Sequence, residues 1–112
     1  MDADRKKTQM SSYSIPDLLQ LLKQARGEGV RVEVGYSPVL IVKGQSHEVE
    51  GPVVMEESID EMLREVASTR DLRAFRRNSK LDIVVRLSNT DYLVRAIRAF
   101  GENRLDLQPV PK

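Results

Sequence analysis

The sequence predicts an α+β domain in which an antiparallel sheet of about six strands carries two or three helices on one face. In some segments apolar residues recur every three or four positions, and in others at every second position. These are the spacings of amphipathic helices and of half-buried strands. The strand-like segments follow one another across short turns, which favours antiparallel pairing of neighbours. The predicted order is therefore α-βββ-αα-βββ.

The first predicted element is a helix that begins after Ser14, which can cap it, and tolerates Pro16 in its first turn. Gly27 and Gly29 are expected to stop this helix. Its apolar face comprises Ile15, Leu18, Leu19, Leu22 and Ala25. Residues 1–13 contain almost nothing to bury, so we expect a disordered lead-in there and a single domain over residues 14–112.

Three short strands are predicted next. Residues 30–34 alternate between Val and charged side chains, which is typical of a half-buried strand. Residues 35–38 form a Gly- and Pro-containing turn. Residues 39–42 are apolar throughout, so we expect that strand to be covered on both faces. A turn at residues 44–45 then leads to a third strand at residues 46–49.

Gly51-Pro52 interrupts the regular secondary structure, and two helices and three strands follow it. The first helix is led by Glu56 and Glu57, and its apolar side comprises Ile59, Met62, Leu63 and Val66. Ser68 and Asp71 form a capping pair for the second helix, which carries Leu72 and Phe75. The strands are expected at residues 81–87, 92–100 and 104–110, with turns at residues 88–91 and 101–103.

Composition excludes several classes of site. The chain has 112 residues, no cysteine and one histidine, His47. Disulfides, thiolate zinc sites, cysteine nucleophiles and multi-histidine metal sites are therefore excluded. The longest apolar run has four residues, whereas a membrane helix needs about twenty. With no export signal at the N-terminus, we expect a cytoplasmic protein. No Gly-x-x-x-x-Gly-Lys-Ser/Thr loop occurs, and we expect no enzyme, cofactor or metal.

Four stretches carry a resemblance to a known family. They are a Leu-rich helix ending in Gly (15–29), a Gly-x-x-Pro turn with a strand ending in Gly (35–44), a Gly-Pro break before a helix (51–57), and the closing Val110-Pro111. In this order they resemble the small N-terminal domain of bacterial type IV pilus and type II secretion ATPases, the PilT/GspE-like group. The resemblance spans residues 14–111 and implies a PAS-like fold and a link to twitching motility or secretion.

The chain departs from that family at several positions. Residues 28–32 lack the acid and the histidine of the family's first strand, Ile41 replaces an arginine, and Gln108 replaces another. In the family, arginines of the terminal strands hold nucleotide phosphates at a subunit boundary. Arg95 and Arg98 lie in the matching strand without a clear register. The ATPase core is missing, so the chain is either a free-standing relative or a fragment, and the start at Met1 favours the former.

Charge divides the chain into two halves. Residues 44–63 contain acids but no Lys or Arg, whereas residues 64–104 are rich in Arg. The acidic segment is either an ordinary solvated surface or a docking face for a basic partner. The basic segment is either an ordinary solvated surface or a binding face. In the second case it binds a protein, a second copy of the chain, or the phosphates of a nucleotide or nucleic acid. The candidate partner-binding residues are Tyr36, Arg70, Arg73, Arg77, Arg95, Arg98 and Arg104.

The few aromatic residues are placed periodically, which suits core packing rather than a base-stacking platform. They are Tyr13, Tyr36, Phe75, Tyr92 and Phe100. Tyr36 lies in a turn and is either an exposed anchor for a partner or a cap on the core. His47 follows a turn and is expected to face solvent.

The function predicted from these observations is a non-catalytic interaction or regulatory module of a pilus, secretion or motility system. Its partner is expected to be a protein, such as a pilus or secretion ATPase, or a second copy of the chain. The alternative is a PAS-like domain that senses a small molecule or a nucleotide. Nucleic-acid binding is a weaker alternative.

Overall fold

A computed structural model describes residues 13–110 and contains the predicted element order. The elements are α2 (Ile15–Ala25), β1 (Gly29–Glu33), β2 (Val39–Val42), β3 (Gln45–Glu48), α3 (Glu56–Val66), α4 (Thr69–Asn78), β4 (Lys80–Leu87), β5 (Thr90–Ala99) and β6 (Glu102–Pro109). The predicted lead-in lies outside the described residues except for Tyr13. That residue is buried, and its hydroxyl donates a hydrogen bond to the Pro52 carbonyl at 2.7 Å.

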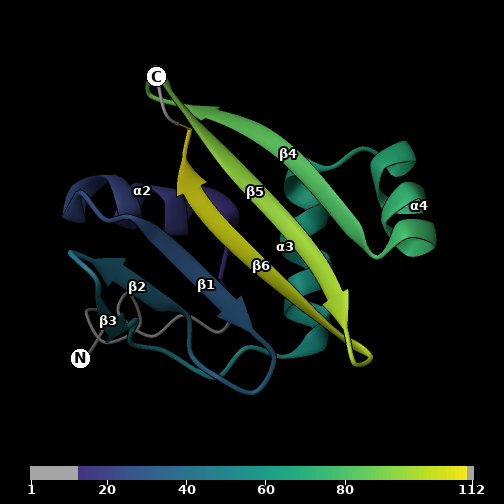
Figure 1. Cartoon of the computed structure of the whole chain (residues 1–112), viewed down its shortest axis with the longest axis horizontal. Coiled ribbons are helices and arrows are strands. Elements are labelled where there is room, and N and C mark those ends of the chain that lie inside the picture. Colours follow the sequence, from purple (N-terminus) through teal and green to yellow (C-terminus); the bar gives the residue numbers. More distant parts are fainter. Residues whose placement is uncertain (1–12, 111–112) are drawn as a thin grey trace, which may run out of the picture.

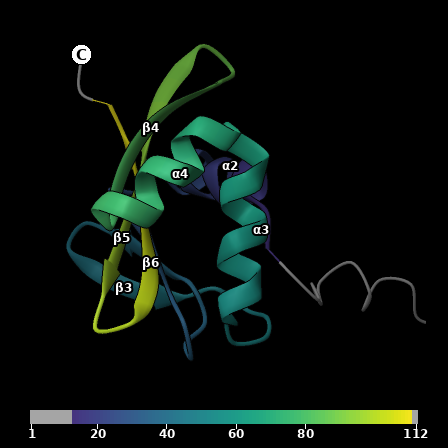
Figure 2. The same cartoon turned by 90° about the vertical axis from the view of Figure 1, so that its right-hand side faces the viewer.

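The six strands form one antiparallel sheet in the order β3-β2-β1-β6-β5-β4. Each half of the chain contributes a three-stranded meander, and the two meanders join where β1 pairs with β6, with Val32 opposite Leu105. The three helices of residues 13–110 lie on one side of the sheet (Figures 1 and 2). The predicted α+β class and its one-sided helical layer are confirmed.

Alternate residues of the central strands supply the core between sheet and helices. Val94, Leu105 and Leu107 are fully buried on β5 and β6, while the residues between them face the other side. The helices contribute the apolar stripes predicted from their spacing. Those stripes comprise Ile15, Leu18, Leu19 and Leu22 from α2, Ile59, Met62 and Leu63 from α3, and Phe75 from α4.

The helix termini follow the local sequence closely. The Ser14 hydroxyl accepts a hydrogen bond from the Asp17 amide at 3.2 Å, and Ser68 with Asp71 forms a complete capping box. The end of α2 differs from the prediction, because Arg26 rather than Gly27 adopts the left-handed conformation. Gly27 is needed for a different reason. A Cβ there would lie 3.0 Å from the Ile41 carbonyl oxygen.

The expectation that residues 39–42 are covered on both faces is wrong. Of the four residues in β2, only Leu40 is buried. Helices cover one side of this antiparallel sheet, so the opposite side of β2 faces solvent. Residues 39–42 are therefore apolar without being covered on both faces, and their strand lies next to the edge strand β3.

Phe100 was expected in the core and is instead fully exposed, with a relative accessibility of 105%. It occupies the tight turn between β5 and β6, where Phe100 and Gly101 both have positive φ. Ser88 and Asn89 have the same conformation in the β4–β5 turn. Two consecutive positive φ values give a turn whose twist matches antiparallel strands. The side chain of a turn residue at the tip of a hairpin has no core to enter.

Candidate interaction surfaces

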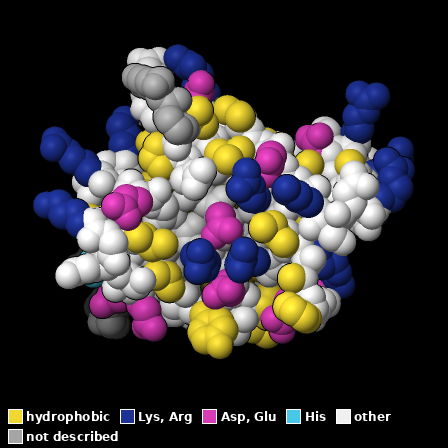
Figure 3. All heavy atoms as spheres, viewed as in Figure 1, with side chains coloured by type: hydrophobic (Ala, Val, Ile, Leu, Met, Phe, Trp, Pro, Cys, Tyr) yellow, Lys and Arg dark blue, Asp and Glu magenta, His cyan; other side chains and the backbone are white. Residues whose placement is uncertain are grey.

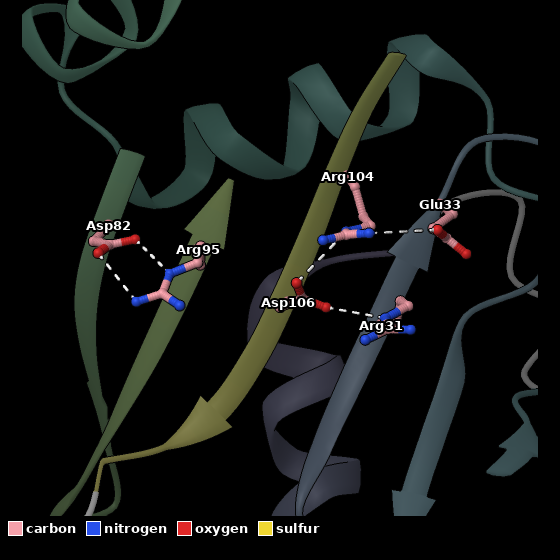
Figure 4. A network of polar contacts seen from close by, with 6 residues as sticks. All are labelled: Arg31, Glu33, Asp82, Arg95, Arg104 and Asp106. Carbon is pink, nitrogen blue, oxygen red and sulfur yellow. Dashed lines mark hydrogen bonds and ion pairs between the residues drawn. The ribbon is translucent and has the colours of Figure 1, made fainter. Parts of the chain in front are cut away.

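The side of the sheet away from the helices, here called the open face, carries a row of alternating charges. Arg31, Asp106, Arg95 and Asp82 stand opposite one another on β1, β6, β5 and β4. Figure 4 shows their side chains at close quarters. Arg95 Nε lies 2.9 Å from Asp82 Oδ1, and Arg31 Nε lies 3.3 Å from Asp106 Oδ1. Cross-strand neighbours of opposite sign stabilise this arrangement.

Arg104 on β6 extends this row of charges to Glu33, the last residue of β1, which stands opposite it. Its Nη1 lies 4.0 Å from Glu33 Oε2, and its Nε lies 3.6 Å from Asp106 Oδ2 (Figure 4). The Nε atom is buried and has no hydrogen-bond partner in the part of the chain that the structure describes. Asp106 therefore serves two arginines, one with a hydrogen bond and one with a longer ion pair.

The pairing neutralises most of the charge on the open face. The hydrogen bond from Arg95 to Asp82, reinforced by their charge attraction, raises the pKa of the Arg95 guanidinium. Arg86 on β4 pairs with Asp91 at 3.1 Å in the same way. Figure 3 shows blue and magenta side chains interleaved over this face. Such a surface offers little net attraction to a phosphate chain, because each cation already has a carboxylate beside it.

Arg98 lies on the opposite, helix-facing side of the sheet. It is three residues from Arg95 on β5, and side chains alternate between faces along a strand. Its Nη1 donates a hydrogen bond to Asn103 Oδ1 at 3.1 Å and lies 4.0 Å from Glu56 Oε2. Arg95 and Arg98, both predicted as candidate partner-binding residues of one strand, therefore belong to different surfaces.

Arg70, Arg73 and Arg77 form a third group, here called the α4 arginines. All three are exposed on α4, at the helical spacings predicted from the sequence. None forms an ion pair with another described residue. Basic side chains extend outward at the right of Figure 3, where α4 lies in Figure 1. The α4 arginines are thus more available to a partner than Arg95 or Arg104.

Tyr36 lies on a fourth surface, at the end of the molecule where β1 ends. Its side chain is 66% exposed, so it does not cap the core. The Gly35 amide donates to the Val54 carbonyl, and the Val54 amide donates to the Tyr36 carbonyl, both at 2.8 Å. These bonds hold the turn after β1 against the segment that leads into α3. Because Val54 is buried, its neighbours Val53 and Met55 point outward.

Phe100 completes this apolar end, defined as Tyr36, Val53, Met55 and Phe100. A shallow pocket of about 200 Å³ beside Phe100 is lined by residues of β1, β5, β6 and their ends, and Tyr36, Val53 and Met55 are not among them. The β1–β2 turn, the β5–β6 turn and the start of α3 all lie at the lower end of Figure 1. Hydrophobic side chains are exposed along the lower border of Figure 3. Four of the five large exposed hydrophobic residues of the described chain belong to this apolar end.

Sequence reasoning found Tyr36 but missed Val53, Met55 and Phe100. No signal in the sequence distinguishes Val53 and Met55 from Val54 between them, since all three are apolar. The glycine after Phe100 could have marked it as a turn residue. His47 is exposed, as predicted, and lies on β3.

The described residues offer neither a metal site nor a membrane-spanning helix. Residues 13–110 contain no group of three or more His, Cys, Asp or Glu side chains that could hold a metal ion. Within the same residues, no helix has the length and apolar character needed to cross a membrane.

Comparison with known proteins shows a shared fold. No protein-family model and no curated protein matches the sequence. Among solved structures, the pilus retraction motor PilT with bound ADP superposes with a TM-score of 0.78 at 12% identity, covering 89% of this chain and 30% of that one. The ATPase DotB of Legionella pneumophila gives 0.72 at 11% identity, covering 93% and 31%. DotB of Yersinia pseudotuberculosis gives 0.72 at 11%, covering 91% and 32%.

The chain therefore spans about a third of the length of these ATPases and has the fold of their N-terminal part. The family resemblance drawn from the sequence is confirmed at the level of this fold. The catalytic core of the ATPases lies outside the matched region.

Proposed function

We propose that this chain is a non-catalytic protein-interaction module of a type IV pilus, secretion or motility system. It docks onto a cytoplasmic ATPase of the PilT or DotB kind, or onto another component of such a system. The fold shared with the N-terminal part of PilT and DotB supports this assignment. The absence of a phosphate-binding loop from the sequence supports a role without catalysis.

The apolar end carries the proposal. Phe100 is fully exposed, and Tyr36, Val53 and Met55 keep half or more of their surface in contact with solvent. Exposed apolar groups that gather at one end of a molecule are candidates for an interaction site, whereas scattered ones are normal. Aromatic side chains are the commonest anchors in protein interfaces. Glu57 and Glu102 adjoin this end without an ion pair to another described residue, so the surface suits a partner with apolar and basic groups. Glu33 and Glu56 contribute less, because they lie 4.0 Å from Arg104 and Arg98.

The α4 arginines supply the second part of the proposed contact. Exposed charges at the periphery of an interface increase the rate of association and select partners, more than they add affinity. Arg95, Arg98 and Arg104 contribute less in this proposal, because each is already bonded within the domain.

Binding to a purified ATPase of this kind from the same organism tests the apolar end. The double variant Tyr36→Ser with Phe100→Ser should lose at least tenfold in affinity, since an aromatic anchor typically contributes about 2 kcal/mol or more. The matched control is Val84→Ser, which replaces a 61% exposed apolar residue on the open face. The control should bind like the natural protein. Equal binding by the double variant would overturn the proposal.

A charge reversal tests the α4 arginines. Arg73→Glu with Arg77→Glu should reduce the association rate several-fold and leave the thermal midpoint nearly unchanged, because both side chains are exposed. The control Lys23→Glu with Lys43→Glu changes the net charge equally at exposed sites on other elements. Identical rates for both variants would show that net charge, not the α4 arginines, governs the encounter.

A further inference from the structure

A hollow of about 340 Å³ lies between α3, α4 and the helix-facing side of the sheet. None of the surfaces described above includes it, although Arg98 reaches it from β5. Its volume falls within the range of small-molecule sites. The lining residues are Glu56, Asp60, Leu63, Arg64, Leu72, Phe75, Arg76, Arg98 and Asn103.

The apolar part of the lining comes from both helices. Leu63 and Phe75 are buried core residues, and Leu72 is half-buried beside them. Leu72 and Phe75 are three residues apart on α4, so they share a helix face. Leu63 and Phe75 are 1% and 6% exposed, so each offers only an edge to the hollow, and Leu72 offers most of the accessible apolar surface. A small planar or branched apolar group would contact Leu72 and these two edges.

The polar part includes Asn103, which is only 4% exposed and is the one buried polar residue among residues 13–110. Its Oδ1 accepts the hydrogen bond from Arg98 Nη1 at 3.1 Å, and its side-chain Nδ2 donates no hydrogen bond to another described side chain. A polar group of this kind in the lining of a hollow orients a ligand rather than adding contact area.

Charged side chains are distributed unevenly around the hollow. Glu56, Asp60 and Arg64 recur at a spacing of four along α3, so one face of that helix changes from acidic to basic. Arg76 on α4 adds a second guanidinium. Neither Arg64 nor Arg76 forms an ion pair with another described residue, whereas Arg98 lies 4.0 Å from Glu56.

We propose that this hollow binds a small organic monoanion, a carboxylate attached to an aromatic or branched apolar body. The body packs on Leu72 and on the exposed edges of Leu63 and Phe75, and the carboxylate pairs with Arg64 and Arg76. A guanidinium offers a carboxylate two parallel hydrogen bonds, which favours this class of anion. A polyphosphate is disfavoured, because Glu56 and Asp60 occupy the same wall and repel additional negative charge. The proposal does not depend on the docking function.

Amide NMR titration of the natural protein with phenylacetate provides the test, with neutral phenylacetamide as the matched control. Phenylacetate should shift the resonances of Leu72, Phe75 and Asn103, and should bind about tenfold more tightly than phenylacetamide. Equal affinity for the two compounds would contradict the role of the arginines. Absence of shifts at these residues up to the solubility limit of the acid would overturn the proposal.

Two variants locate the site. Arg64→Gln with Arg76→Gln should reduce the affinity for phenylacetate about tenfold and bring it to that of phenylacetamide. The control Arg70→Gln with Arg73→Gln removes equal charge from exposed positions outside the hollow and should bind normally. Loss of affinity in the control to the same degree would show that phenylacetate responds only to net charge, which would contradict the proposal.

Discussion

The two faces of the sheet are built from the same strands and differ in almost every property. On β6, Leu105 is buried against the helices, while its neighbour Asp106 binds Arg31 on the open face. The helix face therefore supplies stability through apolar burial. The open face holds cross-strand charges that largely satisfy one another. Because these charges are already paired within the domain, the open face has few free charged groups with which to bind a partner.

The groups that remain available lie away from both faces. The apolar end is formed where strands terminate and turns begin, and the α4 arginines project from the helical layer. The proposed docking surface therefore lies at an end of the molecule. The helix face is occupied by the core, and the open face is neutralised.

The largest effect is expected on the helix face. Leu105→Ala should lower the free energy of unfolding by about 2–5 kcal/mol, because it leaves a cavity where the side chain is fully buried. Urea denaturation measures the change. Val84→Ala on the open face is the control and should change the free energy by less than about 0.5 kcal/mol. Comparable losses in the two variants would show that the faces do not differ in the way described.

A smaller effect is expected at the margin of the core, where Tyr13 meets Pro52. Tyr13→Phe removes the 2.7 Å hydrogen bond and should cost about 1 kcal/mol near neutral pH. Burial raises the pKa of the Tyr13 hydroxyl above that of an unfolded tyrosine. The stability that Tyr13 contributes is therefore complete below about pH 10 and is lost as the pH rises through the folded-state pKa. Urea unfolding of both proteins from neutral to alkaline pH should show their difference shrinking. A constant difference would mean that the hydroxyl does not titrate differently in the folded state.

The smallest effect is expected on the open face. Asp106→Asn removes the charge that serves Arg31 and Arg104, and should cost about 1 kcal/mol or less, because the ion pairs are partly exposed. The loss should decrease as salt is added, since salt screens exposed charges. Thermal unfolding at low and high salt measures both quantities. A loss as large as that of Leu105→Ala would show that the charge row is a main source of stability.

Much of the fold followed from local sequence. Ser14 and the Ser68–Asp71 pair marked helix starts that the structure confirms, because caps depend on a few adjacent residues. The alternation of apolar and polar residues predicted which segments form strands. Coverage of residues 39–42 was predicted wrongly, because it depends on where that strand lies in the sheet and not on its own composition.

The candidate site was less accessible to sequence reasoning. One part could be predicted: Arg95 and Arg98 are three positions apart in one strand, so the alternation of side chains places them on opposite faces. The partners of Arg104 required the register between β1 and β6, which the sequence does not specify. The apolar end depends on the bridge between Val34 and Val54, which are far apart in the chain. Long-range pairing of this kind determines which apolar residues remain exposed.

We expect the apolar end, and not the open face, to contact the protein partner. A photoreactive phenylalanine analogue placed at position 100 or, separately, at position 84 tests it directly in cells of the source organism, since both side chains are exposed on different surfaces. The account predicts a cross-link to a pilus or secretion ATPase, or to another component of that system, from position 100 and none from position 84. A cross-link from position 84 alone, or equal yields from both positions, would contradict it.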